Sequence, residues 1–148
     1  MSPSLYPSGN PRFNHVAMSL PADLLDESNR GDLCRYFGDV LGFDEMPTMT
    51  VDRKRLIFSC VHWDQFIFLI AEGDPMKCPR MDHYGLAVQS LEDLTAVRDR
   101  AVDFKKGDDR LELIDLHMDD QGPVKIHSIY LKYLLPMMCE LQWWEFAK

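Results

Sequence analysis

The sequence has few cysteines, and their spacing is uninformative for metal or redox chemistry. Its 148 residues include four cysteines, no two of which form a Cys-x-x-Cys pair. The chain therefore lacks the common cysteine metal and redox motifs. Cys60 and Cys139 lie in apolar stretches, where a free cysteine behaves as a small hydrophobic residue. We expect reduced thiols in a cytoplasmic protein.

Long hydrophobic runs and basic clusters are also missing. No apolar stretch reaches the roughly 18 residues that span a bilayer, so no membrane partner is expected. The net charge is -8, and no basic residues cluster as a nucleic-acid surface would require. No nucleic-acid partner is therefore expected. Residues 1–12 are rich in Pro, Ser and Gly without the apolar centre of a signal peptide, which predicts a flexible lead-in. The expected partner is a small molecule.

Two short alternating stretches each carry one histidine. Residues 14–20 read NHVAMSL and residues 82–88 read DHYGLAV. In a strand, the histidine and the small residues of each stretch fall on one face, and the large apolar residues fall on the other. One face would pack and the other would line an open space. His15 and His83 are 68 residues apart (83 − 15), which indicates two copies of one supersecondary unit.

The remaining pattern gives each half the order β-α-β-β-β. Apolar residues at helical spacing predict a first helix that Asn29 or Asp32 caps and Gly42 ends, and a second helix over residues 91–104. The other expected strands are residues 46–52, 56–62, 65–71, 111–118, 125–134 and 137–146. A Gly- and Pro-containing linker over residues 72–80 separates the halves. We predict one α+β domain, residues 13–148, made of modules 13–74 and 81–148.

The repeated order and its motifs resemble a known superfamily. The segments NHVAMSL…YFGDVLGF and DHYGLAV…IYLKYLLPMMCEL are similar to the vicinal oxygen chelate proteins, which include glyoxalase I, methylmalonyl-CoA epimerase, the fosfomycin and bleomycin resistance proteins, and extradiol dioxygenases. The resemblance implies a cupped, incomplete barrel-like sheet around a divalent metal. Members of the family pair modules across subunits, and the C-terminal strand is apolar and carries tryptophan, so we expect a homodimer.

His15, His83 and Glu140 are the expected metal ligands. Glu140 lies within the apolar stretch 137–144, where an ionised carboxylate is unfavourable unless a cation compensates it. Two imidazoles and one carboxylate are typical of Fe(II) sites and compatible with Mn(II). Zn(II) and Ni(II) are alternative metals for the same ligands. The alternative is that both histidines are core residues bonded to backbone and that Glu140 pairs with an arginine such as Arg35.

The resemblance leaves the reaction open. Glyoxalase and epimerase members supply a fourth ligand from the last strand of the first half, where Glu72 is the residual candidate because it follows His15 by 57 residues, as Glu140 follows His83. That strand is otherwise apolar, which favours the three-ligand members. Tyr130 keeps the place of the tyrosine that precedes the glutamate in extradiol enzymes. It is a candidate to donate a proton or bind substrate, and a packed core tyrosine is the equal alternative.

Other aromatic residues and histidines give weaker signals. Alternation places His127 opposite Tyr130, so we expect it to be structural. His62 and His117 are candidates to contact a site, although as residues at strand ends they are expected to be partly exposed side chains. Trp144 shares the face of Glu140 and would suit a wall for a planar substrate, although packing or a subunit contact explains it equally well.

The sequence therefore predicts a divalent-metal-dependent enzyme that acts on a small oxygen-chelating substrate. An extradiol ring-cleavage dioxygenase is the leading hypothesis. The alternatives are a glyoxalase- or epimerase-type lyase or isomerase, and a metal-free ligand-binding protein like the bleomycin resistance proteins.

Overall fold

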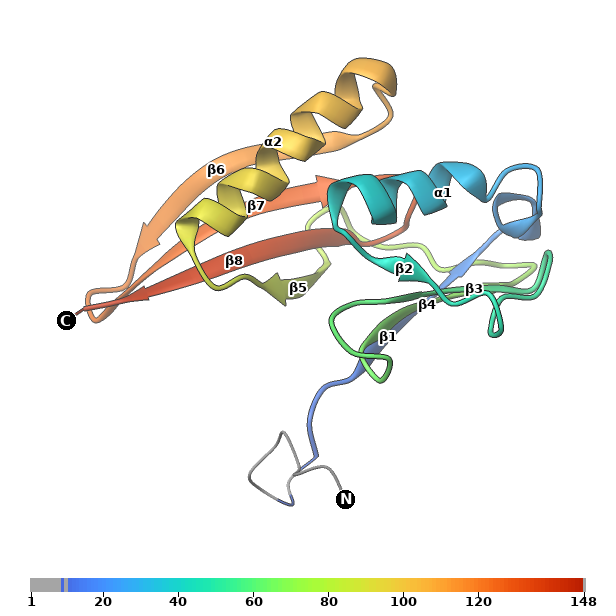
Figure 1. Cartoon of the computed structure of the whole chain (residues 1–148), viewed down its shortest axis with the longest axis horizontal. Coiled ribbons are helices and arrows are strands. Elements are labelled where there is room, and N and C mark those ends of the chain that lie inside the picture. Colours follow the sequence, from blue (N-terminus) through green and yellow to red (C-terminus); the bar gives the residue numbers. More distant parts are fainter. Residues whose placement is uncertain (1–8, 10, 148) are drawn as a thin grey trace.

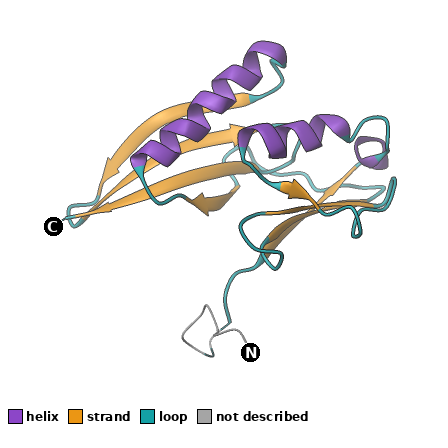
Figure 2. Ribbon diagram, in the orientation of Figure 1, coloured by secondary structure: helices purple, strands orange, loops and turns teal. Residues whose placement is uncertain are grey.

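The chain folds into two modules, each a four-stranded sheet with helices on one face (Figures 1 and 2). The computed structural model describes residue 9 and residues 11–147. The first module contains β1 (His15–Leu20), η1 (Ala22–Leu25), α1 (Gly31–Arg35), η2 (Tyr36–Val40), β2 (Asp44–Glu45), β3 (Arg55–Ser59) and β4 (Phe66–Ala71). The second contains β5 (His83–Ala87), α2 (Leu91–Gly107), β6 (Glu112–Asp120), β7 (Val124–Lys132) and β8 (Met138–Phe146). The predicted α+β class and the repeated order are confirmed. The predicted lead-in over residues 1–12 lies mostly outside the described residues.

The two sheets have the same topology. Their strand orders are β1-β4-β3-β2 and β5-β8-β7-β6, and the first and last strands of each module pair in parallel. The helical segment between those strands provides the crossover that a parallel pair requires. Within the described residues no strand pairing joins the two sheets, so β1 and β5 each keep one free edge.

The first helix forms where its apolar spacing predicts, but its start differs from the prediction. Neither predicted residue caps it, because Asn29 and Arg30 already belong to a turn whose backbone N–H groups bond to the Asp26 carbonyl. The helix continues as a wider turn, η2, and ends before Gly42, whose φ of 72° is a conformation that side chains with a Cβ disfavour.

The second helix is three residues longer than predicted and begins with a side-chain cap. The hydroxyl of Ser90 accepts a hydrogen bond from the backbone N–H of Asp93 at 3.0 Å. Leu94, Val97 and Ala101 form its buried face. This face packs on β6, β7 and β8.

The strand predicted over residues 46–52 does not form: Asp44–Glu45 pair with β3, and Val51 makes one isolated bridge to Arg55. The chain turns at Met46 instead, where the backbone N–H groups of Met49 and Thr50 both donate to its carbonyl. Pro47 has no N–H to donate to a strand ladder, which favours the turn. The prediction was therefore wrong here because a proline outweighed the strand-forming residues around it.

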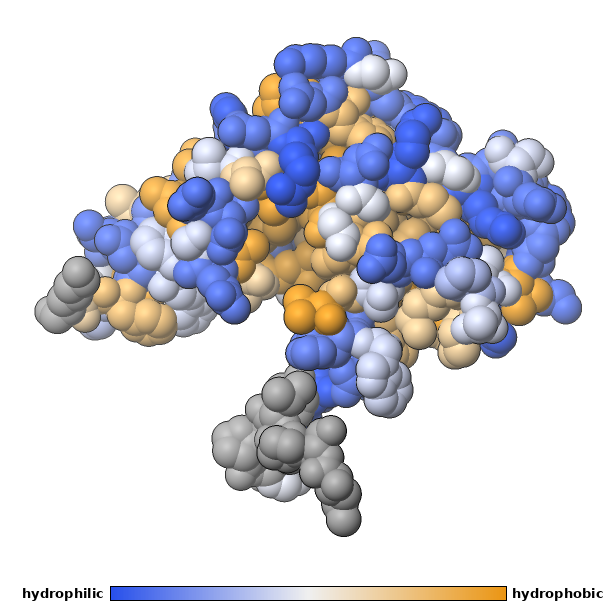
Figure 3. Space-filling model, viewed as in Figure 1, coloured by the Kyte–Doolittle hydropathy of each residue, from blue (hydrophilic) through white to orange (hydrophobic). Residues whose placement is uncertain are grey.

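One hydrophobic core extends across both modules. Tyr36 of the first module contacts the rings of Tyr133 and Phe104 of the second, at centroid distances of 5.1 and 6.2 Å. In Figure 3, apolar surface gathers in the middle of the molecule, where the modules meet. All four cysteines are free, and burial raises the pKa of the Cys139 thiol to about 12. None of the helices in the described part of the chain has the length and apolar character that crossing a membrane requires.

An ion cluster on the outside of this core also joins the modules. Asp108, which follows α2, accepts hydrogen bonds from Arg110 at 2.5 Å and from the Tyr133 hydroxyl at 2.5 Å. Arg110 reaches across to Asp32 of α1 at 2.9 Å, and Arg35 of α1 lies 3.5 Å from Asp108. Four charged side chains therefore connect α1 to the loop between α2 and β6.

Candidate metal site

The open face of the second sheet, the face turned away from α2, carries polar side chains. Alternation along β8 sends Cys139 and Leu141 into the core and leaves Glu140 on the open face. The strand register places Tyr130 of β7 and Gly85 of β5 opposite Glu140. As the sequence predicts, the face formed by the histidine and the small residues of β5 is exposed.

His83 and Glu140 meet on this open face. Their Nε2 and Oε2 atoms are 3.0 Å apart, and Glu140 is only 7% exposed. The Nδ1 atom of His83 lies 2.7 Å from the Met81 carbonyl, which can only accept, so Nδ1 carries a hydrogen. In the neutral imidazole Nε2 is then an acceptor that faces the carboxylate. A proton or a metal ion must lie between them.

The donor set and its spacing fit a divalent metal. Two ligands at right angles on an ion, each with a bond of about 2.1 Å, lie about 3 Å apart, which matches the observed pair. A buried carboxylate without an arginine or lysine partner also needs a cation. The ion pair of Glu140 with Arg35 that the alternative interpretation requires is not formed, because Arg35 pairs with Asp32 and Asp108.

Tyr130 completes this cluster. Its ring lies edge-on to His83 at 5.4 Å between centroids, and its hydroxyl interacts with Glu140. Burial and the hydrogen bond to Glu140 raise the pKa of Tyr130 to about 12, so the phenol is a proton donor near neutral pH. Burial by itself raises the pKa of Glu140, but hydrogen bonds from Gln142, Tyr130 and Ser128 and the charge of His83 outweigh it and leave the pKa below its usual value.

His15 occupies the matching place in the first module but is not part of this cluster within one chain. Its ring stacks on Phe66 at 4.7 Å, and its Nδ1 lies 2.6 Å from the Asn14 side-chain oxygen. Among the described residues of one chain, no three His, Cys, Asp or Glu side chains gather closely enough to hold a metal. The structure therefore brings together two of the three predicted ligands, together with Tyr130.

The first module offers no carboxylate equivalent to Glu140. In the second sheet Glu140 pairs with Gly85, two residues after His83, and in the first sheet Phe68 pairs with Ala17, two residues after His15. Glu72 follows the end of β4, and its backbone N–H bonds to the carbonyl of Leu20, five residues beyond His15. Equal spacing in the sequence therefore pointed to Glu72, whereas the register assigns the equivalent place to a phenylalanine.

The other singled-out residues divide between the two faces. His127 lies on the helix-covered face, where it bonds to Glu145 at 2.9 Å and contacts Trp143, as the alternation predicts. Trp144 is on the open face and 47% exposed. His117 also lies on the open face, because the register of β6 shifts between Ile114 and His117, and it stands within β6 and not at a strand end.

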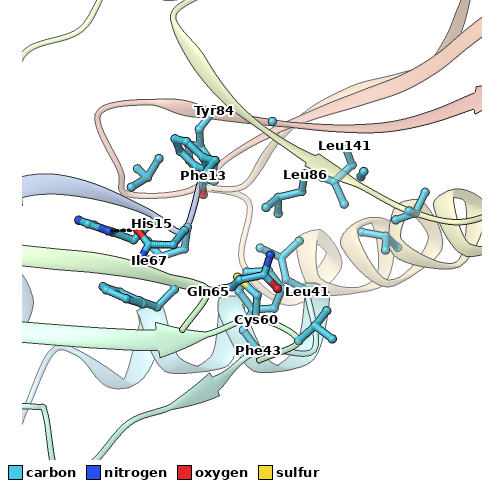
Figure 4. Close-up of a pocket in the computed structure, with 18 residues that line it drawn as sticks. Phe13, His15, Leu41, Phe43, Cys60, Gln65, Ile67, Tyr84, Leu86 and Leu141 are labelled. Atoms are coloured by element: carbon cyan, nitrogen blue, oxygen red, sulfur yellow. Dashed lines mark hydrogen bonds between the residues drawn. The ribbon is translucent and has the colours of Figure 1, made fainter. Parts of the chain in front are cut away.

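A cavity of about 400 Å³ opens between the modules next to β1 and β5 (Figure 4). The first module contributes His15, Phe43, Cys60 and Ile67 to its wall, and the second contributes Tyr84, Leu86 and Leu141. The wall is mainly apolar. The wall thus includes residues of β1 and β5, the strands that stand at the edges of their sheets.

The comparisons with known proteins found similar solved structures but no similar sequence. No family model matches the sequence, and no curated protein gives a significant match. A lactoylglutathione lyase from Agrobacterium tumefaciens has a TM-score of 0.63 at 12% identity, over 91% of this chain and 95% of that chain. A mutant of the fosfomycin resistance protein FosX from Listeria monocytogenes, complexed with Mn(II) and 1S,2S-dihydroxypropylphosphonic acid, has a TM-score of 0.61 at 15% identity, over 88% and 87%.

A third solved structure has the same fold. A glyoxalase family protein from Bacillus anthracis has a TM-score of 0.58 at 18% identity, over 93% of this chain and 98% of that chain. These identities are low, and the agreement lies in the arrangement of the two βαβββ modules over nearly the whole chain. The chain therefore has the vicinal oxygen chelate fold of the glyoxalase and fosfomycin resistance proteins.

Proposed function

We propose that this protein is a divalent-metal-dependent enzyme that binds a small substrate through two adjacent oxygens. The observation that carries the proposal is the buried Glu140 carboxylate facing the acceptor nitrogen of His83 at 3.0 Å, without a permanent cation beside it. We assign the metal to His15, His83 and Glu140. Fe(II) or Mn(II) suits this donor set best, and Zn(II) or Ni(II) would also bind it. A bound ion would supply Lewis-acid stabilisation of an oxyanion or enolate on the substrate.

We further propose that the site is shared between the two subunits of a homodimer. His15 of one copy would join His83 and Glu140 of the other, because one chain keeps the two groups apart. The face of the first sheet that carries His15 and Phe66 would then lie against the open face of the second sheet of the other copy. This pairing explains why the site is incomplete in a single chain.

The reaction class follows from the number of ligands. Phe68 stands where a fourth ligand would be expected, which supports three-ligand chemistry over the four-ligand glyoxalase or epimerase type. Tyr130 would donate a proton to the substrate, and Glu140 would bind the metal. Oxygen-dependent cleavage of a catechol ring is the leading candidate, and addition to or isomerisation of a non-aromatic vicinal-oxygen compound is the second, supported by the Mn(II) and diol ligands of FosX. We place this enzyme in the cytoplasm.

Metal content tests the proposal. Glu140→Gln and His83→Ala should each lower bound metal in the purified full-length protein by about tenfold or more, because each removes a ligand. His127→Ala is the matched control, since it removes a histidine from the opposite face of the same sheet. Equal metal content in all three variants and the wild type would eliminate the proposed ligands, and a wild-type protein that binds no metal would favour a metal-free binding protein. Oxygen uptake by the Fe(II)-loaded protein with catechols then separates ring cleavage from the second reaction.

A further inference from the structure

The cavity between the modules lies on the other side of the second sheet from the His83–Glu140 pair. Its wall includes Tyr84 of β5 and Leu141 of β8, which both belong to the core. Alternation sends their chain neighbours His83 and Glu140 to the open face, and neither is part of the described wall. Of the proposed metal ligands, only His15 reaches the wall. A molecule in this cavity would therefore not contact the His83–Glu140 pair.

The wall of the cavity is apolar. Most of its side chains are aliphatic or aromatic, and among the described residues no Asp, Glu, Lys or Arg belongs to it. Phe13 and Val61 extend this apolar lining to the surface, where they are 74% and 83% exposed. The volume of about 400 Å³ lies in the range of small-molecule pockets, about 300 to 1,000 Å³. Such a wall stabilises an uncharged apolar molecule that leaves water and offers a charged one no permanent counter-charge.

One buried polar group in the wall lacks a partner. Tyr84 is 6% exposed, and no described nitrogen or oxygen forms a hydrogen bond with its hydroxyl. In Figure 4 its side chain extends from β5 into the space between the modules. The thiols of Cys139 and Cys60 lie near enough to influence the hydroxyl, but sulfur is a weak acceptor.

The Tyr84 hydroxyl is therefore an unused donor. Burial raises the pKa of Tyr84 well above its usual value, so the hydroxyl keeps its hydrogen. Buried hydrogen-bonding groups in folded proteins are nearly always satisfied, and an exception calls for a partner from outside the chain. An acceptor on a bound molecule would supply that partner.

We propose that this cavity binds an uncharged, mainly apolar small molecule that carries one hydrogen-bond acceptor, such as a ketone oxygen. The apolar body would fill the space between the modules, and the acceptor would receive the hydrogen of the Tyr84 hydroxyl. The inference goes beyond the proposed function and does not depend on a bound metal.

Prodan, an uncharged naphthalene with one ketone, tests the proposal in the full-length protein, because its emission moves to shorter wavelength in apolar surroundings. We expect saturable binding to the wild type. Tyr84→Phe keeps the ring but removes the donor, so it should bind Prodan about fivefold more weakly. N,N-dimethyl-2-naphthylamine has the same ring system without the ketone and should bind both proteins equally.

Three further variants locate the probe. Leu86→Trp places a larger side chain in the wall and should weaken binding at least about tenfold. Leu116→Trp is the matched control, since Leu116 is an exposed residue of β6 outside the wall, and it should bind as the wild type does. Glu140→Gln, which changes the open face, should also bind Prodan unchanged.

The thermal midpoint of ligand-free Tyr84→Phe should equal or exceed that of the wild type, because an unpaired hydroxyl adds no hydrogen bond to the fold. A clearly lower midpoint would show that the hydroxyl is bonded within the protein and would overturn the inference. Wild-type protein that binds no Prodan, or equal Prodan affinity in the wild type and either Tyr84→Phe or Leu86→Trp, would also overturn it. Loss of binding in Glu140→Gln would place the probe on the open face instead.

Discussion

At the scale of single residues, two carboxylates in similar burial have different roles because their neighbours differ. Asp108 is bonded to Arg110, whose guanidinium keeps its charge at every accessible pH, and to the Tyr133 hydroxyl. Its charge is therefore always compensated. Glu140 faces an imidazole, which can release its proton and bind a metal instead. We infer that Asp108 stabilises the fold and that Glu140 serves the site.

The stability of the protein should reveal the role of Asp108. Hydrogen bonds from Arg110 and Tyr133 hold the pKa of Asp108 well below its usual value. The native state therefore binds fewer protons than the unfolded state, so this stabilisation is complete above about pH 4 and is lost as the pH falls further. Asp108→Asn should lower the free energy of unfolding at pH 7, and its difference from the wild type should shrink below about pH 4.

Urea denaturation at a series of pH values would measure this difference. Asp103→Asn is the control, because Asp103 forms an exposed pair with Lys106 within one helix, where little stabilisation is expected. A constant difference between wild type and Asp108→Asn from pH 7 to pH 3 would contradict the assignment.

At the scale of elements, the positions where helices and strands end determine which side chains line the cavity between the modules. The helical segment that covers the first sheet ends at Val40, and Gly42 with its positive φ turns the chain back toward β2. Phe43 then bonds through its backbone N–H to the Phe37 carbonyl and lines the cavity between the modules. The turn thus connects a local backbone requirement to the shape of the cavity.

Gly42→Ala should destabilise the protein by about 1 kcal/mol, because an alanine disfavours the left-handed backbone even where space for its Cβ exists. Gly31→Ala is the matched control: Gly31 has ordinary helical backbone and open space around it, so alanine should be neutral or slightly stabilising. Thermal or urea denaturation would compare the two variants. Equal stabilities would mean that the turn relaxes without strain.

At the scale of the whole molecule, the separation of His15 from His83 and Glu140 is the main feature. The two modules share one core through Tyr36, Tyr133 and Phe104, yet no described strand pairing joins the sheets. A second copy that covers the free edges of β1 and β5 would remove two exposed strand edges and bring the third ligand to the site. We therefore expect a dimer in solution.

Mixing two inactive variants tests whether the site is shared. His15→Ala and Glu140→Gln should each lose the metal, but a dimer with one chain of each kind would contain one intact site. After subunit exchange, about a quarter of the sites should bind metal again, since half of the dimers are mixed and half of their sites are intact. Light scattering should report a mass of two chains. A monomer near 17.2 kDa, or no recovery of metal on mixing, would contradict the shared site.

The sequence by itself determined the features that depend on short-range periodicity. Alternation placed His83 and Glu140 on the open faces of their strands and His127 on the opposite face, and helical spacing located both main helices. These patterns are local, because neighbouring side chains in a strand or helix point in directions that the backbone geometry sets. The repeat of the two histidine stretches predicted the paired modules in the same way.

Only the tertiary structure decided which side chains stand opposite one another. The register placed Phe68, and not Glu72, where Glu140 stands in the other module, since pairing compares strands and not sequence distances. One extra residue in β6 reversed the face of His117, and Pro47 helped to turn a predicted strand into a loop. The packing of the modules within one chain separates His15 from the other two predicted ligands. Pairing, bulges and module packing depend on contacts between distant residues, which the local pattern does not contain.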